Sequence, residues 1–198
     1  MSKYICLDIG GTYIKYGVLT QEGKFLSKGQ NPTIKENQHI LDNIKNIIRS
    51  CKKDYDVKGI CISSAGIVDS KKGKIISATL IPNYSGLNLK EELEKEFNIN
   101  CEVENDVNCV GIAESFIGEA KNTSSSVCIT VGTGIGGCII VANKILNGFT
   151  NSAGELGYMH IKDSRFSKIA TTSSLVNRVS KLKNRKISGE EIFELAKC

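Results

Sequence analysis

The sequence predicts an α/β fold made of two lobes. Apolar β-branched runs flank two glycine-rich turns, at Asp8–Thr12 and at Val131–Gly137. After the first three apolar runs, the spacing of apolar residues changes to three and four, which is typical of helices that follow strands. Tyr4–Leu19 and Ser126–Val141 also share one pattern of strand, glycine turn and strand. This internal repeat indicates that the same strand–turn–strand unit occurs twice in the chain.

The first lobe is predicted over residues 1–118. A meander of three strands begins at Tyr4, spans Tyr13–Leu19 and ends near Phe25. Apolar residues then recur at helical spacing, in an amphipathic helix with Ile40, Leu41, Ile44, Ile47, Ile48 and Cys51. The remaining elements are a strand over Val57–Ser63, a helix marked by Leu89, Leu93 and Phe97, a strand over Asn100–Glu104, and a helix marked by Val107, Val110, Ala113 and Ile117.

The second lobe is predicted over residues 119–198. The polar run Gly118–Ser126 ends the first lobe, and a new meander begins at Val127. Helices are expected at Ser174–Leu182 and at Ser188–Lys197. The second of these begins with the spacing of a capping box, Ser188 and Glu191.

Composition argues against several classes of partner. The 26 Lys and Arg residues exceed the 21 Asp and Glu residues, but they are scattered as on solvated faces, so no nucleic-acid partner is expected. No charged-then-apolar leader and no apolar run of bilayer length occurs, so we expect no membrane partner and a cytoplasmic protein. Cys6, Cys61, Cys128 and Cys138 lie in apolar strand runs without any Cys-x-x-Cys pair, which predicts reduced, mostly buried thiols.

The two glycine turns are candidate phosphate loops. Glycine allows a left-handed φ at a sharp bend and lacks the Cβ that would keep a phosphate away. A single glycine turn of this kind is more often an ordinary tight β-turn. Two such turns together could bind one polyphosphate from both sides. Neither has the Gly-Lys-Ser/Thr ending of a Walker A loop. Asp8, at the end of a strand beside the first turn, would hold Mg²⁺ on the phosphates, directly or through water, or would form an Asx turn.

This order of strands and helices is the layout of the actin-like ATPase fold, in which two ribonuclease-H-like lobes clamp a nucleotide. Four motifs, in order, resemble the ROK family of bacterial sugar kinases and repressors: Asp8–Thr12, Glu104–Asn108, Gly132–Gly137 and Ala153–Gly157. The resemblance implies an ATP-dependent kinase that phosphorylates a hydroxyl of a hexose or hexoside, such as glucose, an N-acetylhexosamine, fructose or a β-glucoside. Its cofactors would be ATP and Mg²⁺, and it would form a homodimer.

The resemblance also implies site residues. Asp106 would be the general base; its position before a helix alone fits a helix N-cap equally well. Sugar contacts would come from Gly66, Asn83, Asn105, Asp106 and Glu155, although Glu155 also fits an ordinary loop carboxylate. The ATP phosphates would be bound by Gly10, Gly11, Thr12, Lys15, Gly132, Thr133, Gly134 and Gly136. The strand alternation at Lys15 fits a solvent-facing lysine equally well.

Three departures from the family pattern bear on function. Tyr158 stands where many members have a zinc-binding His, and their cysteine motif is missing, so no zinc site is expected and the zinc-free branch with β-glucoside kinases fits best. The chain is shorter than family kinases, which implies an incomplete second lobe. It also starts at the first hairpin, without the helix-turn-helix of the repressors. The alternatives are a non-catalytic sugar- or nucleotide-binding remnant or fragment and, with less support, an activator-type ATPase.

Overall fold

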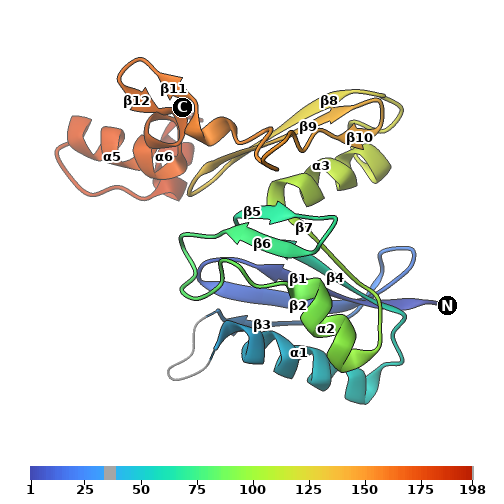
Figure 1. The fold of residues 1–198 in the computed structure, drawn as a ribbon. Helices are drawn as coiled ribbons and strands as arrows, with labels where there is room; N and C mark the ends of the chain where they lie inside the picture. Colours follow the sequence, from blue (N-terminus) through green and yellow to red (C-terminus); the bar gives the residue numbers. More distant parts are fainter. Residues whose placement is uncertain (34–38, 198) are drawn as a thin grey trace. The chain divides into compact units, whose positions relative to one another are not determined.

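The computed structural model describes residues 1–33 and 39–197, which divide into two compact units, Met1–Cys109 and Val110–Cys198. Figure 1 shows how the strands and helices of each unit are arranged. Helix α3 (Asp106–Ile117) crosses from the first unit into the second. The lobe boundary expected between residues 118 and 119 stays a prediction.

The first unit is built on a five-stranded sheet in the order β3-β2-β1-β4-β7. Its strands are β1 (Lys3–Ile9), β2 (Tyr13–Thr20), β3 (Phe25–Pro32), β4 (Gly59–Ser64) and β7 (Cys101–Asn105). The first three form an antiparallel meander, and β4 and β7 extend the sheet from β1 in parallel. The predicted order of a meander followed by alternating helices and strands is confirmed.

Two helices cover one face of this sheet, α1 (Ile40–Asp54) and α2 (Leu89–Phe97) (Figure 1). Each helix buries one apolar stripe, as an amphipathic helix on a sheet must. Helices and sheet share one core that includes Ile5, Leu7, Ile9, Ile14, Val18, Ile44, Ile48, Ile60, Ile62, Leu89, Leu93 and Val103. Because successive strand residues alternate between faces, Cys6, Asp8, Cys61 and Ser63 lie on the opposite face.

A short hairpin follows β4, formed by β5 (Ile67–Asp69) and β6 (Lys74–Ser77), and the sequence analysis does not predict it. Both strands are too short to show an alternating pattern. Gly66, just before the hairpin, has a left-handed φ of 101°, and a Cβ there would lie 2.3 Å from the carbonyl oxygen of Ser77. The backbone itself therefore requires glycine at this position.

The second unit contains a three-stranded antiparallel sheet in the order β10-β9-β8. Its strands are β8 (Ser126–Val131), β9 (Ile135–Val141) and β10 (Lys144–Ile145). Helix α3 packs closely on β9, since a Cβ on Gly111 would lie 2.5 Å from Sγ of Cys138. The other elements are η1 (Leu156–Tyr158), β11 (His160–Ile161), β12 (Ser164–Arg165), α4 (Phe166–Ile169), α5 (Thr172–Leu182) and α6 (Gly189–Leu195). The predicted hairpin and the last two helices are confirmed.

The internal repeat is present in the structure, with two differences between its copies. Ile9 pairs with Ile14 around the first turn, whereas Val131 pairs with Ile135, so the second turn is one residue shorter. Burial also differs at equivalent positions, because Leu7 is 2% exposed and Ile129 is 51% exposed. Strand β1 lies inside its sheet, but β8 is at the edge of the described second sheet. The face of β8 that carries Val127, Ile129 and Val131 is open in the described structure, since all three side chains are exposed.

The expectation of mostly buried strand cysteines is wrong. Of the four, Cys138 is buried, Cys6 and Cys128 are partly buried, and Cys61 is exposed. The reason is strand alternation, which turns Cys6 and Cys61 away from the helix-covered core, while Cys128 lies on an edge strand.

Along the described residues, none of the helices has the length and apolar content that crossing a membrane requires.

Candidate functional site

Most predicted site residues of the first unit lie at or just beyond the carboxyl ends of its three parallel strands. Asp8 and the Gly10 turn lie at the end of β1, Gly66 follows β4, and Asn105 ends β7. In sheets with parallel strands and crossover helices, ligands bind at this edge, because loops and helix N-termini meet there. The topology thus brings together residues that lie far apart in the sequence.

Asp8 is exposed and bonds across the sheet rather than within its own turn. Its Oδ1 accepts a hydrogen bond of 2.9 Å from Oγ of Ser63, the register partner of Asp8 on β4. On its other side, Lys15 of β2 is the register partner of Asp8 and is also exposed. The Lys15 ammonium therefore lies on the same sheet face as the Asp8 carboxylate.

A buried threonine supports the first glycine turn through two hydrogen bonds. Thr33 is fully buried; its Oγ donates to the carbonyl oxygen of Gly10 at 2.6 Å, and its N–H donates to that of Thr12 at 2.9 Å. Asn43 of α1 fixes this segment in turn, because its Nδ2 donates to the carbonyl oxygen of Pro32 at 2.8 Å. Sequence reasoning missed both supports, although a polar Asn43 within the apolar stripe of α1 was a readable signal.

The glycines of the two turns are not explained by backbone conformation, and the expected left-handed φ is wrong for Gly10, Gly11, Gly132 and Gly134. A Cβ added at Gly132 or Gly134 would meet no heavy atom within 4 Å, and one at Gly11 would meet Leu80 at an ordinary 3.5 Å. The space in front of these positions is open. At Gly11, Gly132 and Gly134, the lack of a Cβ would let a ligand approach the backbone closely. At Gly10, a Cβ would lie 3.3 Å from the carbonyl oxygen of Tyr13, so packing within the turn also favours glycine.

Asp106 is the first residue of α3, and the capping role belongs to its neighbour. Oδ1 of Asn105 accepts from the N–H groups of Val107 at 2.9 Å and Asn108 at 3.0 Å, which is the N-cap interaction. Oδ1 of Asp106 accepts from the Val107 N–H at 2.9 Å and from Nδ2 of Asn105 at 3.0 Å. These two bonds fix the carboxylate of Asp106.

The electrostatic surroundings make Asp106 a stronger base than an ordinary aspartate. Burial raises its pKa by penalising the charged form, and the negative charge of Asp8 raises the pKa further. The hydrogen bonds from Val107 and Asn105 act in the opposite direction, and the net direction is upward. A raised pKa in a half-buried carboxylate that feels the charge of a second carboxylate is typical of a functional site.

The amide of Asn105 uses all of its hydrogen-bonding capacity within the protein. Nδ2 donates to Asp106 and, at 2.9 Å, to the carbonyl oxygen of Gly66, while Oδ1 accepts the two backbone N–H groups of α3. A sugar hydroxyl that bonded Asn105 would therefore have to replace or share one of these bonds. Asn83 is exposed, has a left-handed φ of 56°, and precedes Tyr84, whose buried hydroxyl lies 2.8 Å from Oγ of Ser64.

In the second unit, the glycine turn lies against the N-terminus of a helix. Within the turn, the N–H of Gly132 donates to the carbonyl oxygen of Gly134 at 3.0 Å. The N–H of Thr172, the first residue of α5, donates to the carbonyl oxygen of Gly132 at 3.1 Å. The positive end of the α5 dipole is thus directed at the turn, where negative charge is stabilised.

The segment Ala153–Gly157 packs directly on β9, and its glycines make this possible. A Cβ on Gly137 would lie 2.4 Å from the carbonyl oxygen of Gly154, and one on Gly157 would lie 2.2 Å from that of Ile135. This close packing holds Glu155, which is partly buried, against the strand that follows the second turn. Nearby, Tyr158 is exposed, and the Arg165 guanidinium lies 5.5 Å from the centre of its ring.

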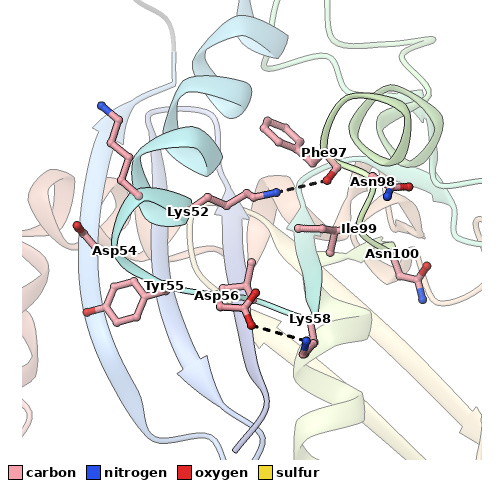
Figure 2. A pocket seen from close by; sticks show the side chains of 11 residues that line it. Lys52, Asp54, Tyr55, Asp56, Lys58, Phe97, Asn98, Ile99 and Asn100 are labelled. Carbon is pink, nitrogen blue, oxygen red and sulfur yellow. Dashed lines mark hydrogen bonds and ion pairs between the residues drawn. The ribbon is translucent and has the colours of Figure 1, made fainter.

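A pocket of about 690 Å³ lies elsewhere in the first unit, lined by residues 52–58 and 97–100 (Figure 2). These residues precede β4 and β7, so the pocket is at the amino ends of the parallel strands. Lys52 Nζ donates to the carbonyl oxygen of Phe97 at 3.3 Å, which caps the end of α2. None of the predicted site residues lines this pocket.

The sequence matches the ROK family over residues 4–197. It is 46% identical to an uncharacterised protein of Clostridium perfringens over 91% of the chain and 62% of that protein. It is 34% identical to a β-glucoside kinase of Listeria monocytogenes, over 96% of the chain and 68% of the kinase. The structure resembles that of a ROK family glucokinase from Streptomyces griseus in complex with glucose and AMPPNP, with a TM-score of 0.82 and 27% identity, over 99% of the chain and 71% of the glucokinase.

The predicted α/β, actin-like fold class is confirmed by this structural similarity. The chain spans 62% to 71% of the length of these relatives.

Proposed function

The chain belongs to the ROK family, and on that premise we propose that it transfers the terminal phosphoryl group of ATP to a hydroxyl of a hexose or hexoside. The single observation that carries the proposal is the state of Asp106. Its carboxylate follows the carboxyl end of a parallel strand, has a raised pKa, and is fixed by two hydrogen bonds at its Oδ1. Phosphoryl transfer to an alcohol needs such a positioned base.

In the proposed reaction, Asp106 accepts the proton of the sugar hydroxyl whose oxygen attacks the γ-phosphorus. The phosphorus–oxygen bond to ADP breaks as the new bond forms, and the proton stays on the Asp106 carboxyl until solvent removes it. The raised pKa supports this role because proton transfer is more favourable to a stronger base. Asn105 would keep the carboxylate oriented through the bond from its Nδ2.

The proposed phosphate contacts come from both glycine turns. Open space before Gly11, Gly132 and Gly134 supports a close approach of phosphate oxygens to the backbone. Gly10, Thr12, Thr133 and Gly136 belong to the same turns or their edges, and Lys15 would add positive charge on the Asp8 side. The N-terminus of α5 would favour the anion at the second turn.

Mg²⁺ fits the first unit through Asp8. The exposed Asp8 carboxylate presents oxygen, the donor that Mg²⁺ prefers, and Ser63 orients it. Within residues 1–33 and 39–197, no three His, Cys, Asp or Glu side chains converge as a metal cluster. Asp8, water and the substrate phosphates would therefore form the site, as is usual for Mg²⁺ in phosphoryl transfer, where the ion neutralises phosphate charge.

The proposed sugar contacts are Gly66, Asn83, Asn105 and Asp106 in the first unit and Glu155 in the second unit. Gly66 supports the role indirectly, since its carbonyl oxygen accepts from Asn105 and its own conformation requires glycine. A site that recognises hydroxyl groups by hydrogen bonds rejects sugars that lack them, because a buried polar partner would be left unpaired. The named relatives favour a β-glucoside or glucose as the substrate.

The test is ADP release by the chain with Mg-ATP and a panel of glucose, N-acetylated hexosamines, fructose and β-glucosides. The proposal predicts that at least one sugar stimulates release and gains one phosphate, detected by mass. Omission of the sugar is the control for ATP hydrolysis. ADP release that no sugar stimulates, from protein whose circular dichroism shows a folded state, would contradict the proposed activity and favour a binding role.

A further inference from the structure

Two cysteines stand side by side on the sheet face opposite the core of the first unit. Cys6 of β1 and Cys61 of β4 are register partners on adjacent parallel strands, and both are thiols. Paired strands lie about 4.8 Å apart. This spacing falls within the range of roughly 4.4–6.8 Å between Cα atoms that a disulfide bond spans.

The two thiols differ in the way that a reactive pair requires. Cys61 is exposed, whereas Cys6 is partly buried beside it. A hydrogen bond from the Cys6 thiol lowers the pKa of Cys61, against the opposing effects of burial and of Glu102. A thiolate is the nucleophilic form of cysteine, and accessible thiolates next to a second cysteine are those that oxidants attack.

We propose that Cys6 and Cys61 are a redox modification site, at which a peroxide oxidises the pair to a reversible disulfide. The Cys61 thiolate attacks one oxygen of the peroxide; the O–O bond breaks, sulfur loses two electrons, and hydroxide leaves. The resulting sulfenic acid is attacked by the Cys6 thiol, which forms the S–S bond and releases water. Two molecules of a small thiol reverse the step and leave as their own disulfide.

The neighbouring residues give the modification a consequence. Asp8 and Ser63 form the next pair along the same strands on the same face, and they are joined by a hydrogen bond of 2.9 Å. A disulfide brings the two Cβ atoms to about 3.8 Å, closer than unlinked strand neighbours stand. The disulfide would draw β1 and β4 together at the pair that precedes Asp8 and Ser63 on this face. An effect on phosphoryl transfer rests on the proposed function, but the disulfide itself does not.

Three other cysteines test the selectivity of the proposal. Cys128 and Cys138 are also register partners, on β8 and β9, but Cys138 is fully buried where α3 packs on the strand. Cys109 lies near Cys6, and burial raises its pKa to about 12, so its thiol is a poor nucleophile. Oxidation is therefore expected at Cys61 first, with Cys6 as its partner.

The experiment treats the whole chain with hydrogen peroxide, blocks remaining thiols with iodoacetamide, and maps the peptides by mass. The expected product links the Cys6 peptide to the Cys61 peptide and disappears after dithiothreitol. In Cys6→Ser, Cys61 should instead be trapped as a sulfenic acid by dimedone, because no thiol remains at position 6 to resolve it. In Cys6→Ala, alkylation of Cys61 should slow below pH 8, because the hydrogen bond from Cys6 that lowers the pKa of Cys61 is lost. Cys128→Ser, the equivalent change in the repeat, should behave like the unmodified chain.

A cross-link to Cys109, a link confined to Cys128 and Cys138, or irreversible oxidation of Cys61 without any link would each overturn the proposal. If the reduced chain also phosphorylates a sugar, peroxide should lower this activity in the wild type and dithiothreitol should restore it. In Cys61→Ser, neither treatment should change the activity. A Cys6–Cys61 link in a chain without sugar-dependent activity would refute the proposed function and leave the redox site intact.

Discussion

The repeat offers an internally matched test of how the two sheets are covered. Leu7 and Ile129 occupy equivalent positions in β1 and β8, yet Leu7 is 2% exposed and Ile129 is 51% exposed. Leu7→Ala deletes buried atoms and leaves a cavity under α1 and α2, which typically costs about 2–5 kcal/mol in free energy of unfolding. Ile129→Ala gives up roughly half of the 1.5–3 kcal/mol of a fully buried side chain and leaves no cavity, so a cost of about 0.8–1.5 kcal/mol is expected.

Urea unfolding followed by amide hydrogen exchange separates the two effects, because peptides from β1 and β8 report on their own units. With a slope of about 1–3 kcal/mol per M urea, Leu7→Ala should lower the midpoint of the first unit by on the order of 1 M or more. At the same slope, Ile129→Ala should shift the midpoint of the second unit by roughly a third of that amount. Equal shifts in the two variants would refute the reasoning, since they would mean that the open face of β8 is covered in solution.

Three further predictions concern the site. Gly132→Ala should leave the melting temperature unchanged, because its Cβ would meet no heavy atom within 4 Å, but it should raise the KM for ATP. Gly137→Ala should lower the melting temperature, because its Cβ would lie 2.4 Å from the carbonyl oxygen of Gly154. Thr33→Val should cost about 1–3 kcal/mol in urea unfolding, because the Gly10 carbonyl oxygen loses its 2.6 Å donor; no change would show that the turn stands unaided. Asp106→Asn should be more stable than wild type at neutral pH, because it removes the half-buried negative charge of Asp106. Because the pKa of Asp106 is raised in the folded state, its contribution to wild-type stability falls as the pH rises. The melting temperatures of wild type and Asp106→Asn should therefore converge as the pH is lowered through that pKa. A difference in melting temperature that stays constant with pH would contradict the effect of burial on Asp106.

Much of the fold was readable because each main element of the first unit carries its own periodicity. Ile40, Ile44 and Ile48 repeat at helical spacing on α1, and Ile5, Leu7 and Ile9 alternate along β1. The hairpin of β5 and β6 escaped prediction because three- and four-residue strands are too short to establish a period. The burial of the strand cysteines was misjudged because an apolar run does not say which face of the sheet is covered.

The candidate site was readable as a set of residues but not as a set of contacts. Asp8, Asn105 and Asp106 follow strand ends, which sequence patterns locate, but the bonds from Ser63 to Asp8 and from Asn105 to Gly66 depend on strand register. The sequence also does not show which of the two adjacent side chains, Asn105 or Asp106, caps α3. Asn105 takes that position in the structure.

The most direct test of the account compares Asp106→Asn with Asp56→Asn for phosphorylation of the best sugar in the panel. Asp56 is a surface carboxylate of the same unit, 88% exposed, at the opposite ends of the parallel strands. If Asp106 is the base, Asp106→Asn lowers kcat by about 10²- to 10⁴-fold, while sugar binding, measured by calorimetry, stays close to wild type. Asp56→Asn should match wild type in both. A kcat in Asp106→Asn within a few-fold of wild type would contradict the assignment of Asp106 as the base.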